Sequence, residues 1–135
     1  MKKYIHFILT SFITLNLGLA SCNKTAEEDK LCTSFTSAPV VKVEGAKTAA
    51  VNQTIALIVS FPCFSSCGNF GNYQQTVTGN TTIINVMAKY QGCICTQDVP
   101  TRQSIYNFSA SQPGIYYLKF LQTANAYLID TITVQ

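Results

Sequence analysis

The alternation of apolar and polar residues at every second position constrains the fold of this chain more than any other feature. The clearest stretch covers residues 54–61, where Ile55, Leu57, Val59 and Phe61 fall on one face of an extended backbone. Side chains of a strand alternate between the two faces of its sheet, so this stretch predicts a strand with one buried face.

Similar short runs recur along the chain, separated by turn residues such as Gly79-Asn80 and Ser111-Gln112-Pro113-Gly114. No window has sustained helical periodicity. We expect strands over residues 40–43, 54–61, 73–78, 82–90, 104–109, 115–121 and 127–134. Seven short strands at this spacing predict an all-β fold, an antiparallel β-sandwich, with a small barrel as the alternative.

The N-terminal segment reads as a targeting signal. Lys2-Lys3 precede an apolar run that is too short and too interrupted for a spanning helix. The run ends in Leu19-Ala20-Ser21-Cys22, which closely resembles the lipobox of bacterial lipoproteins. The resemblance implies that residues 1–21 are a cleaved signal peptide and that Cys22 becomes the lipidated first residue. A cleaved signal without lipid is the alternative.

This resemblance sets the expected domain organisation and location. Residues 22–30 are then the lipidated end and a polar tether, and residues 31–135 form one domain. Lipidated Cys22 implies a membrane partner and a place in the cell envelope, on the periplasmic or surface side of the outer membrane. The acidic run 27–29 loosely resembles the surface-export signal of some Bacteroidota lipoproteins, and a solvated spacer is the alternative.

The segment 113–120 resembles one strand of immunoglobulin-like domains. In that family a turn and a Gly-x-Tyr pattern precede the strand, and the tyrosine forms a corner with the upstream backbone. Gly114 and Tyr116 fit the pattern, while Leu118 stands where antibody domains have a core cysteine. The chain has no tryptophan, so the antibody-type core is absent. The resemblance implies an Ig-like sandwich.

The charged residues argue against several functions. Without the leader, seven Lys and Arg face six Asp and Glu, which is no footprint for a nucleic acid. The single histidine, His6, lies in the leader, which removes the commonest general base and metal ligand. The domain keeps three carboxylates, Glu44, Asp98 and Asp130. We expect no enzyme activity, no catalytic residue and no cofactor.

Five cysteines remain once Cys22 carries lipid: Cys32, Cys63, Cys67, Cys93 and Cys95. An oxidising envelope favours disulfides, and an odd number leaves one thiol over. The sequence does not choose among the pairings, but the local pairs would close very small loops. We therefore predict a disulfide between the 63–67 and 93–95 segments, such as Cys67–Cys95. The alternative is a metal or redox site that uses Cys63, Cys67, Cys93 and Cys95.

A Gly-, Ser- and Asn-rich stretch over residues 63–72 carries aromatic side chains and precedes Tyr73. A cysteine-linked loop with Phe64, Phe70 and Tyr73 is a possible recognition surface, and packing around the disulfide is the alternative. With little acid–base chemistry available, we expect a non-enzymatic binding module whose partner is a protein, a glycan or an envelope component.

Overall fold

The computed structural model describes residues 32–135, and the expected signal peptide (1–21) and the expected lipidated end and tether (22–30) lie outside this range. The described chain consists of nine strands joined by turns and loops. They are β1 (Thr33–Ala38), β2 (Lys42–Glu44), β3 (Thr48–Ala49), β4 (Ile55–Pro62), β5 (Gly68–Thr78), β6 (Thr81–Gln91), β7 (Thr101–Phe108), β8 (Gly114–Thr123) and β9 (Ala126–Val134).

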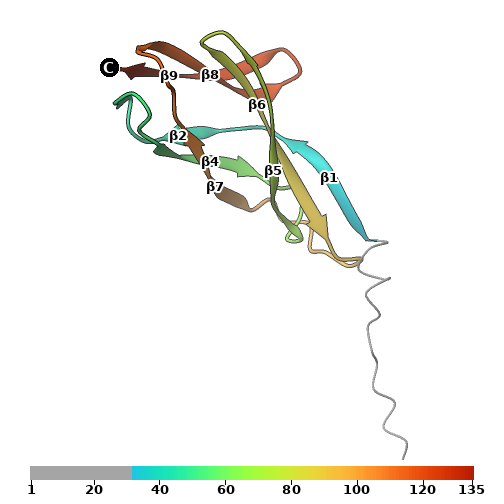
Figure 1. Cartoon of the computed structure of the whole chain (residues 1–135). Helices are drawn as coiled ribbons and strands as arrows, with labels where there is room; N and C mark the ends of the chain where they lie inside the picture. Colours follow the sequence, from blue (N-terminus) through green and yellow to red (C-terminus); the bar gives the residue numbers. More distant parts are fainter. Residues whose placement is uncertain (1–31) are drawn as a thin grey trace, which may run out of the picture.

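The strands form two sheets that pack face to face (Figure 1), which confirms the predicted all-β sandwich. The smaller sheet has the order β2-β4-β7. In the larger sheet β6 pairs with β5 along one side. Along its other side β6 pairs first with β8 and then with β1, and β9 and β3 follow β8. Two pairings, β6 with β8 and β3 with β9, are parallel, whereas the sequence indicated only antiparallel ones.

The core lies between the two sheets, and it includes the residues of the 54–61 segment that the alternation placed on one face. Ile55, Leu57, Val59 and Phe61 of β4 are all buried. Facing them from the larger sheet are Ile84, Val86, Ala88, Leu118, Phe120 and Ile132. Removal of this apolar surface from water is the main term that stabilises the domain.

All seven predicted strands are present, with changes at their ends. The segment predicted at 40–43 is only partly a strand, because Val40 crosses between the sheets. Its N–H donates to the Leu121 carbonyl, and the next N–H, of Val41, donates to the Ser60 carbonyl of β4. Val40 is fully buried at this crossing, so its apolar character reflects packing between the layers.

The tyrosine corner expected in the 113–120 segment is formed. The Tyr116 hydroxyl donates a hydrogen bond of 2.9 Å to the carbonyl of Gln112, four residues upstream. Leu118 is fully buried, as its place in the pattern predicts. This contact fixes the turn that leads into β8.

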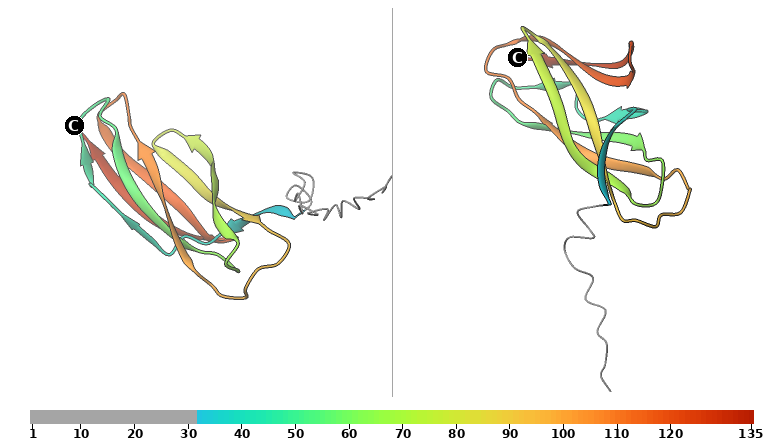
Figure 2. Two further views of the ribbon diagram at one scale, coloured as in Figure 1. Left: turned by 90° about the horizontal axis from the view of Figure 1, so that it is seen from below. Right: turned by 90° about the vertical axis from the view of Figure 1, so that its right-hand side faces the viewer.

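The two ends of the sandwich differ. Figures 1 and 2 show that the start of β1 and the C-terminus lie at opposite ends of the domain. The loops over residues 63–67 and 92–100 lie at the end where β1 begins (Figure 2), and we call them together the disulfide end. Within residues 32–135 no helix is long and apolar enough to cross a bilayer.

Candidate functional site

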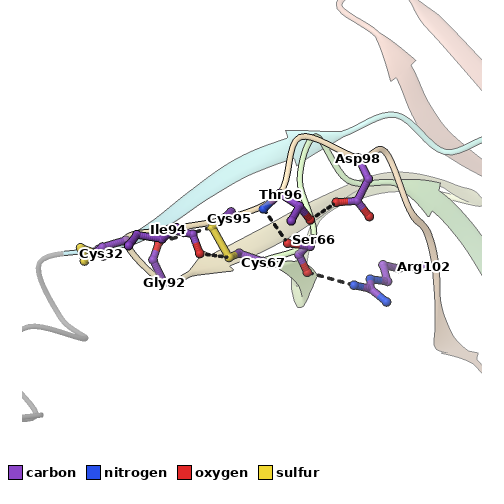
Figure 3. The surroundings of a disulfide bond; sticks show 10 residues. Cys32, Ser66, Cys67, Gly92, Ile94, Cys95, Thr96, Asp98 and Arg102 are labelled. Carbon is purple, nitrogen blue, oxygen red and sulfur yellow. Dashed lines mark hydrogen bonds between the residues drawn. A yellow bond between two sulfur atoms is a disulfide. The ribbon is translucent and has the colours of Figure 1, made fainter.

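Two disulfides cross-link the disulfide end. Cys67 pairs with Cys95, which joins the 63–67 loop to the 92–100 loop (Figure 3), as the loop-size argument favoured. Cys32 pairs with Cys93, which ties the start of β1 to the chain just after β6. Cys63 is the free cysteine among residues 32–135, and it is buried. The structure thus chooses one pairing where the sequence left several open.

Hydrogen bonds also hold the two loops side by side. The N–H of Cys63 donates to the Pro100 carbonyl at 2.9 Å, and the N–H of Ser66 donates to the Thr96 carbonyl at 3.1 Å. The guanidinium of Arg102 donates to the carbonyls of Ser66 and Gly68, at 3.1 and 3.0 Å. Figure 3 shows the contacts of Ser66 with Thr96 and Arg102 beside the Cys67–Cys95 disulfide. The disulfide end is therefore a cross-braced unit.

Cys63 lies where the disulfide end meets the hydrophobic core. Its side chain has no solvent exposure, and a Cβ added at Gly68 would lie 2.5 Å from its Cβ. Burial raises the pKa of the Cys63 thiol, against the opposing effects of a hydrogen bond with Tyr90 and the charge of Arg102. A buried, protonated thiol is a poor nucleophile and a poor metal ligand.

The arrangement of the sulfur atoms differs from a four-thiolate metal site. Of the four residues considered for such a site, Cys67, Cys93 and Cys95 are in disulfides and only Cys63 is a thiol. Within residues 32–135 no three His, Cys, Asp or Glu side chains are grouped so as to hold a metal ion. Thiolate ligation there would first require both disulfides to be reduced.

The three aromatic residues predicted to form a recognition loop do not lie in one loop: Phe70 and Tyr73 pack against each other in a strand, and Phe64 precedes that strand. Phe70 lies in strand β5, so its assignment to a loop is wrong, and Tyr73 lies in the same strand, in agreement with the strand predicted over residues 73–78. Both pack in a row of rings: Phe70 lies 6.3 Å from Phe61 and 4.7 Å from Tyr73, and Tyr73 lies 5.1 Å from Tyr106, between ring centroids. Two hydroxyls close this side of the sandwich, since Tyr73 bonds Ser104 and Tyr106 donates to Gln75.

Only Phe64 lies in a loop, and it is exposed. Its ring is parallel to that of Tyr90 with 6.5 Å between centroids, and its N–H donates to the Tyr90 hydroxyl at 2.8 Å. Two other large apolar side chains of the disulfide end are exposed as well. They are Val99 and Ile94, and Ile94 is 96% exposed although both neighbours are in disulfides.

A second exposed apolar area lies on the outer face of the larger sheet. The register places Ile83 of β6, Lys119 of β8 and Ile129 of β9 in one row across three strands. Tyr117 and Ile115 continue the same face along β8. We call Ile83, Ile115, Tyr117 and Ile129 the sheet patch; each is 40–56% exposed. Its neighbours in register are mainly threonines: Thr76, Thr81, Thr131 and Thr133.

The charges around the sheet patch are of one sign. Lys119 lies within it, and Lys89 projects from the same face at the far half of β6. The three carboxylates of the described chain lie elsewhere. Glu44 pairs with Lys42 on the smaller sheet, Asp98 accepts from Thr96 in the 92–100 loop, and Asp130 points inward and pairs with Lys47. The three carboxylates thus lie on three different elements, and each has its own partner.

A groove of about 390 Å³ opens between the sheets at the end opposite the disulfides. It is lined by the end of β5, the end of β7 and Tyr116 of β8. Val77 points to the inner side of the larger sheet here, opposite buried Thr82, yet it is 63% exposed. The smaller sheet therefore does not cover the last residues of the β5–β6 hairpin.

These features define a disulfide-linked β-sandwich domain with exposed apolar areas on one sheet face and at one end. Residues 57–134, more than half of the chain, match the family described as the ORF11 beta-sandwich domain, and the chain belongs to this family. The matched residues begin within β4 and end with β9, and so contain most of both sheets. The comparisons with curated proteins and with solved structures found no match.

Sequence reasoning missed the sheet patch. The sequence predicted strands over residues 115–121 and 127–134 but assigned no outward face to either. The available signal was that Ile115, Tyr117 and Ile129 are large apolar residues at outward positions, where polar residues are usual. Their grouping depends on the β6–β8 and β8–β9 register, which the sequence does not give.

Proposed function

We propose that this protein is a lipid-anchored component of the bacterial cell envelope, with an Ig-like fold, that acts by binding another protein through the sheet patch. The patch is the observation that carries the proposal. Single exposed apolar residues are ordinary on protein surfaces, but a contiguous group on one flat face marks an interaction site. Four such residues around Lys119 make that group here.

The chemistry of the face supports a protein partner of a particular kind. By register, the outer face of the larger sheet carries Lys119 and Lys89 and no carboxylate. The centre is apolar and the surrounding threonines are neutral. A partner with an apolar centre flanked by Asp or Glu would complement it, since opposite charges at the rim steer association and fix orientation.

The lipobox-like motif supports attachment to the membrane, and the scarcity of acid–base groups supports a non-enzymatic role. The lipobox-like Leu19-Ala20-Ser21-Cys22 motif gives a covalent route to the membrane. Lipidation with more than one chain is enough for stable anchoring. The domain holds no histidine, and its three carboxylates are separately paired, which favours binding over catalysis.

The anchor is tested by Cys22→Ala. We expect this variant to move from the membrane fraction to the soluble fraction, because the acylated thiol is lost. Detection of the full chain in both fractions provides the measurement. A Cys22→Ala protein that stays with the membrane would refute lipid anchorage.

The partner surface is tested by two matched variants, Ile129→Ser in the sheet patch and Ile105→Ser on the outer face of the smaller sheet. Their side chains are 56% and 53% exposed, so both changes should leave the fold intact, which thermal melting checks. We expect a partner captured from the native envelope and then purified to bind Ile105→Ser like the wild type. It should bind Ile129→Ser about tenfold more weakly, as for loss of an apolar side chain at an interface centre.

Two outcomes contradict the assignment. Equal affinity of the two variants would show that the partner binds elsewhere. A wild-type dimer in sedimentation that Ile129→Ser dissociates would assign the patch to a second copy of the chain instead of a different protein.

A further inference from the structure

The disulfide end presents Ile94 to solvent in a way that the fold does not require. Ile94 is 96% exposed and lies between Cys93 and Cys95, which are bonded to Cys32 and Cys67. A side chain held this way between two cross-links cannot turn inward to escape water without moving both of them. The exposed position is therefore a fixed feature of the domain surface.

From this geometry we infer that the disulfide end rests on the membrane, with Ile94 inserted at the boundary between headgroups and acyl chains. The inference rests on the lipid anchor proposed above and adds a second, non-covalent contact to it. The binding partner of the disulfide end is then a phospholipid surface. A rigid loop that carries exposed large apolar residues is suited to this boundary, where apolar burial drives binding.

The length of the chain before the domain argues for the same end. Cys32 lies at the disulfide end and follows Cys22 by ten residues. Ten residues span at most about 35 Å when extended and about 17 Å as a coil. Strand β6, which runs from the opposite end toward Cys93, is itself about 33 Å long at 3.3 Å per residue. A lipid on Cys22 thus holds the disulfide end nearer to the bilayer than the other end.

The composition of the disulfide end also fits a lipid surface. Phe64 and Val99, on the two loops that the Cys67–Cys95 disulfide joins, are exposed together with Ile94. Asp98 is the only ionisable side chain besides the cysteines on residues 63–67 and 92–100. The contact should therefore depend on apolar burial and should not require anionic lipids.

The absence of tryptophan from the chain allows a direct test. Ile94→Trp introduces a single fluorophore at the proposed contact, and Ile115→Trp introduces one at the other end, next to Asn80. The lipidated proteins, which begin at Cys22, are reconstituted into phosphatidylcholine vesicles with and without brominated acyl chains. We expect bromine to quench the fluorescence of the Ile94→Trp protein by at least half and that of the Ile115→Trp protein by less than a tenth.

The possible results distinguish failure of the Ile94 membrane contact from failure of the lipid anchor. If both proteins float with the vesicles and neither is quenched, the anchor stands and the contact is refuted. If the Ile115→Trp protein is quenched more than the Ile94→Trp protein, the opposite end faces the bilayer and the inference is wrong. If the proteins do not float with the vesicles, the anchor fails, and the contact that rests on it fails too.

Discussion

At the scale of single residues, Asp130 shows how burial changes the role of an ordinary surface group. Its position in β9 points inward, opposite Leu118 of β8, and the residue is only 6% exposed. Lys47, just before β3, places its ammonium 2.6 and 2.7 Å from the two carboxylate oxygens. The pair lies at the edge of the larger sheet where β3 begins, and it satisfies a carboxylate that has little access to water.

We predict that Lys47→Met destabilises the domain by about 1–3 kcal/mol, because the Asp130 carboxylate would remain buried without its partner. Lys42→Met is the matched control. It breaks the Lys42–Glu44 pair, whose two side chains are 62% and 48% exposed, and exposed pairs contribute about 0–1 kcal/mol. Urea unfolding of both variants measures the difference. Equal losses of unfolding free energy in the two variants would show that the buried Lys47–Asp130 pair stabilises the domain no more than the exposed Lys42–Glu44 pair.

Two glycines of β5 also have a role that the local sequence does not reveal. Gly68 and Gly71 belong to the stretch 63–72 that the sequence predicted to be a loop, yet both lie in β5. A Cβ at Gly71 would lie 2.7 Å from the Met87 carbonyl and 3.0 Å from the Phe35 ring, beside the β-bulge between Phe70 and Asn72. These glycines allow close packing within a strand. Local propensity cannot distinguish that use from a turn.

At the scale of elements, β1 depends on covalent attachment. It lies at the edge of the larger sheet, and most of its residues are exposed, with only Ala38 fully buried. Few buried contacts mean that an edge strand opens easily. The Cys32–Cys93 disulfide holds the start of β1 beside the end of β6. The sequence did not predict β1, because TSFTSA has no inward apolar pattern.

We predict that the double variant Cys32→Ser/Cys93→Ser loses about 4 kcal/mol of stability and that Cys67→Ser/Cys95→Ser loses about 3.5 kcal/mol. These values follow from the sequence separations of 61 and 28 residues in the chain-entropy estimate. Urea unfolding measures the loss of unfolding free energy in each double variant. Hydrogen exchange should show β1 amides opening faster in the first variant while β8 and β9 stay protected. Unchanged exchange in β1 would show that its strand pairing alone holds it.

At the scale of the whole molecule, the interior favours neutral forms of several ionisable groups. Burial raises the pKa values of Tyr73, Tyr106 and Tyr90 above 10.0 and that of Cys63 above 9.0. These groups bind their protons more tightly in the folded protein than in the unfolded chain. Their contribution to stability is therefore complete below about pH 9 and is lost as the pH rises, because the unfolded chain ionises first.

We predict that the free energy of unfolding falls steadily between about pH 9 and about pH 11, as measured by urea unfolding at fixed ionic strength. Cys63→Ala should delay the start of the decline from about pH 9 to about pH 10, since only the tyrosines then remain. A stability that is constant across this range would contradict the buried positions of these groups.

The sequence by itself determined the β class of the domain and the buried face of its clearest strand, which carries Ile55, Leu57, Val59 and Phe61. Both follow from the two-residue period of a strand, which is local and independent of pairing. Only the tertiary structure decided the pairing of Cys32 with Cys93, the placement of Phe70 in a strand and the grouping of Ile83 with Ile129. Each of these depends on which strands lie side by side. That choice is made by packing between residues far apart in the chain, which no local pattern records.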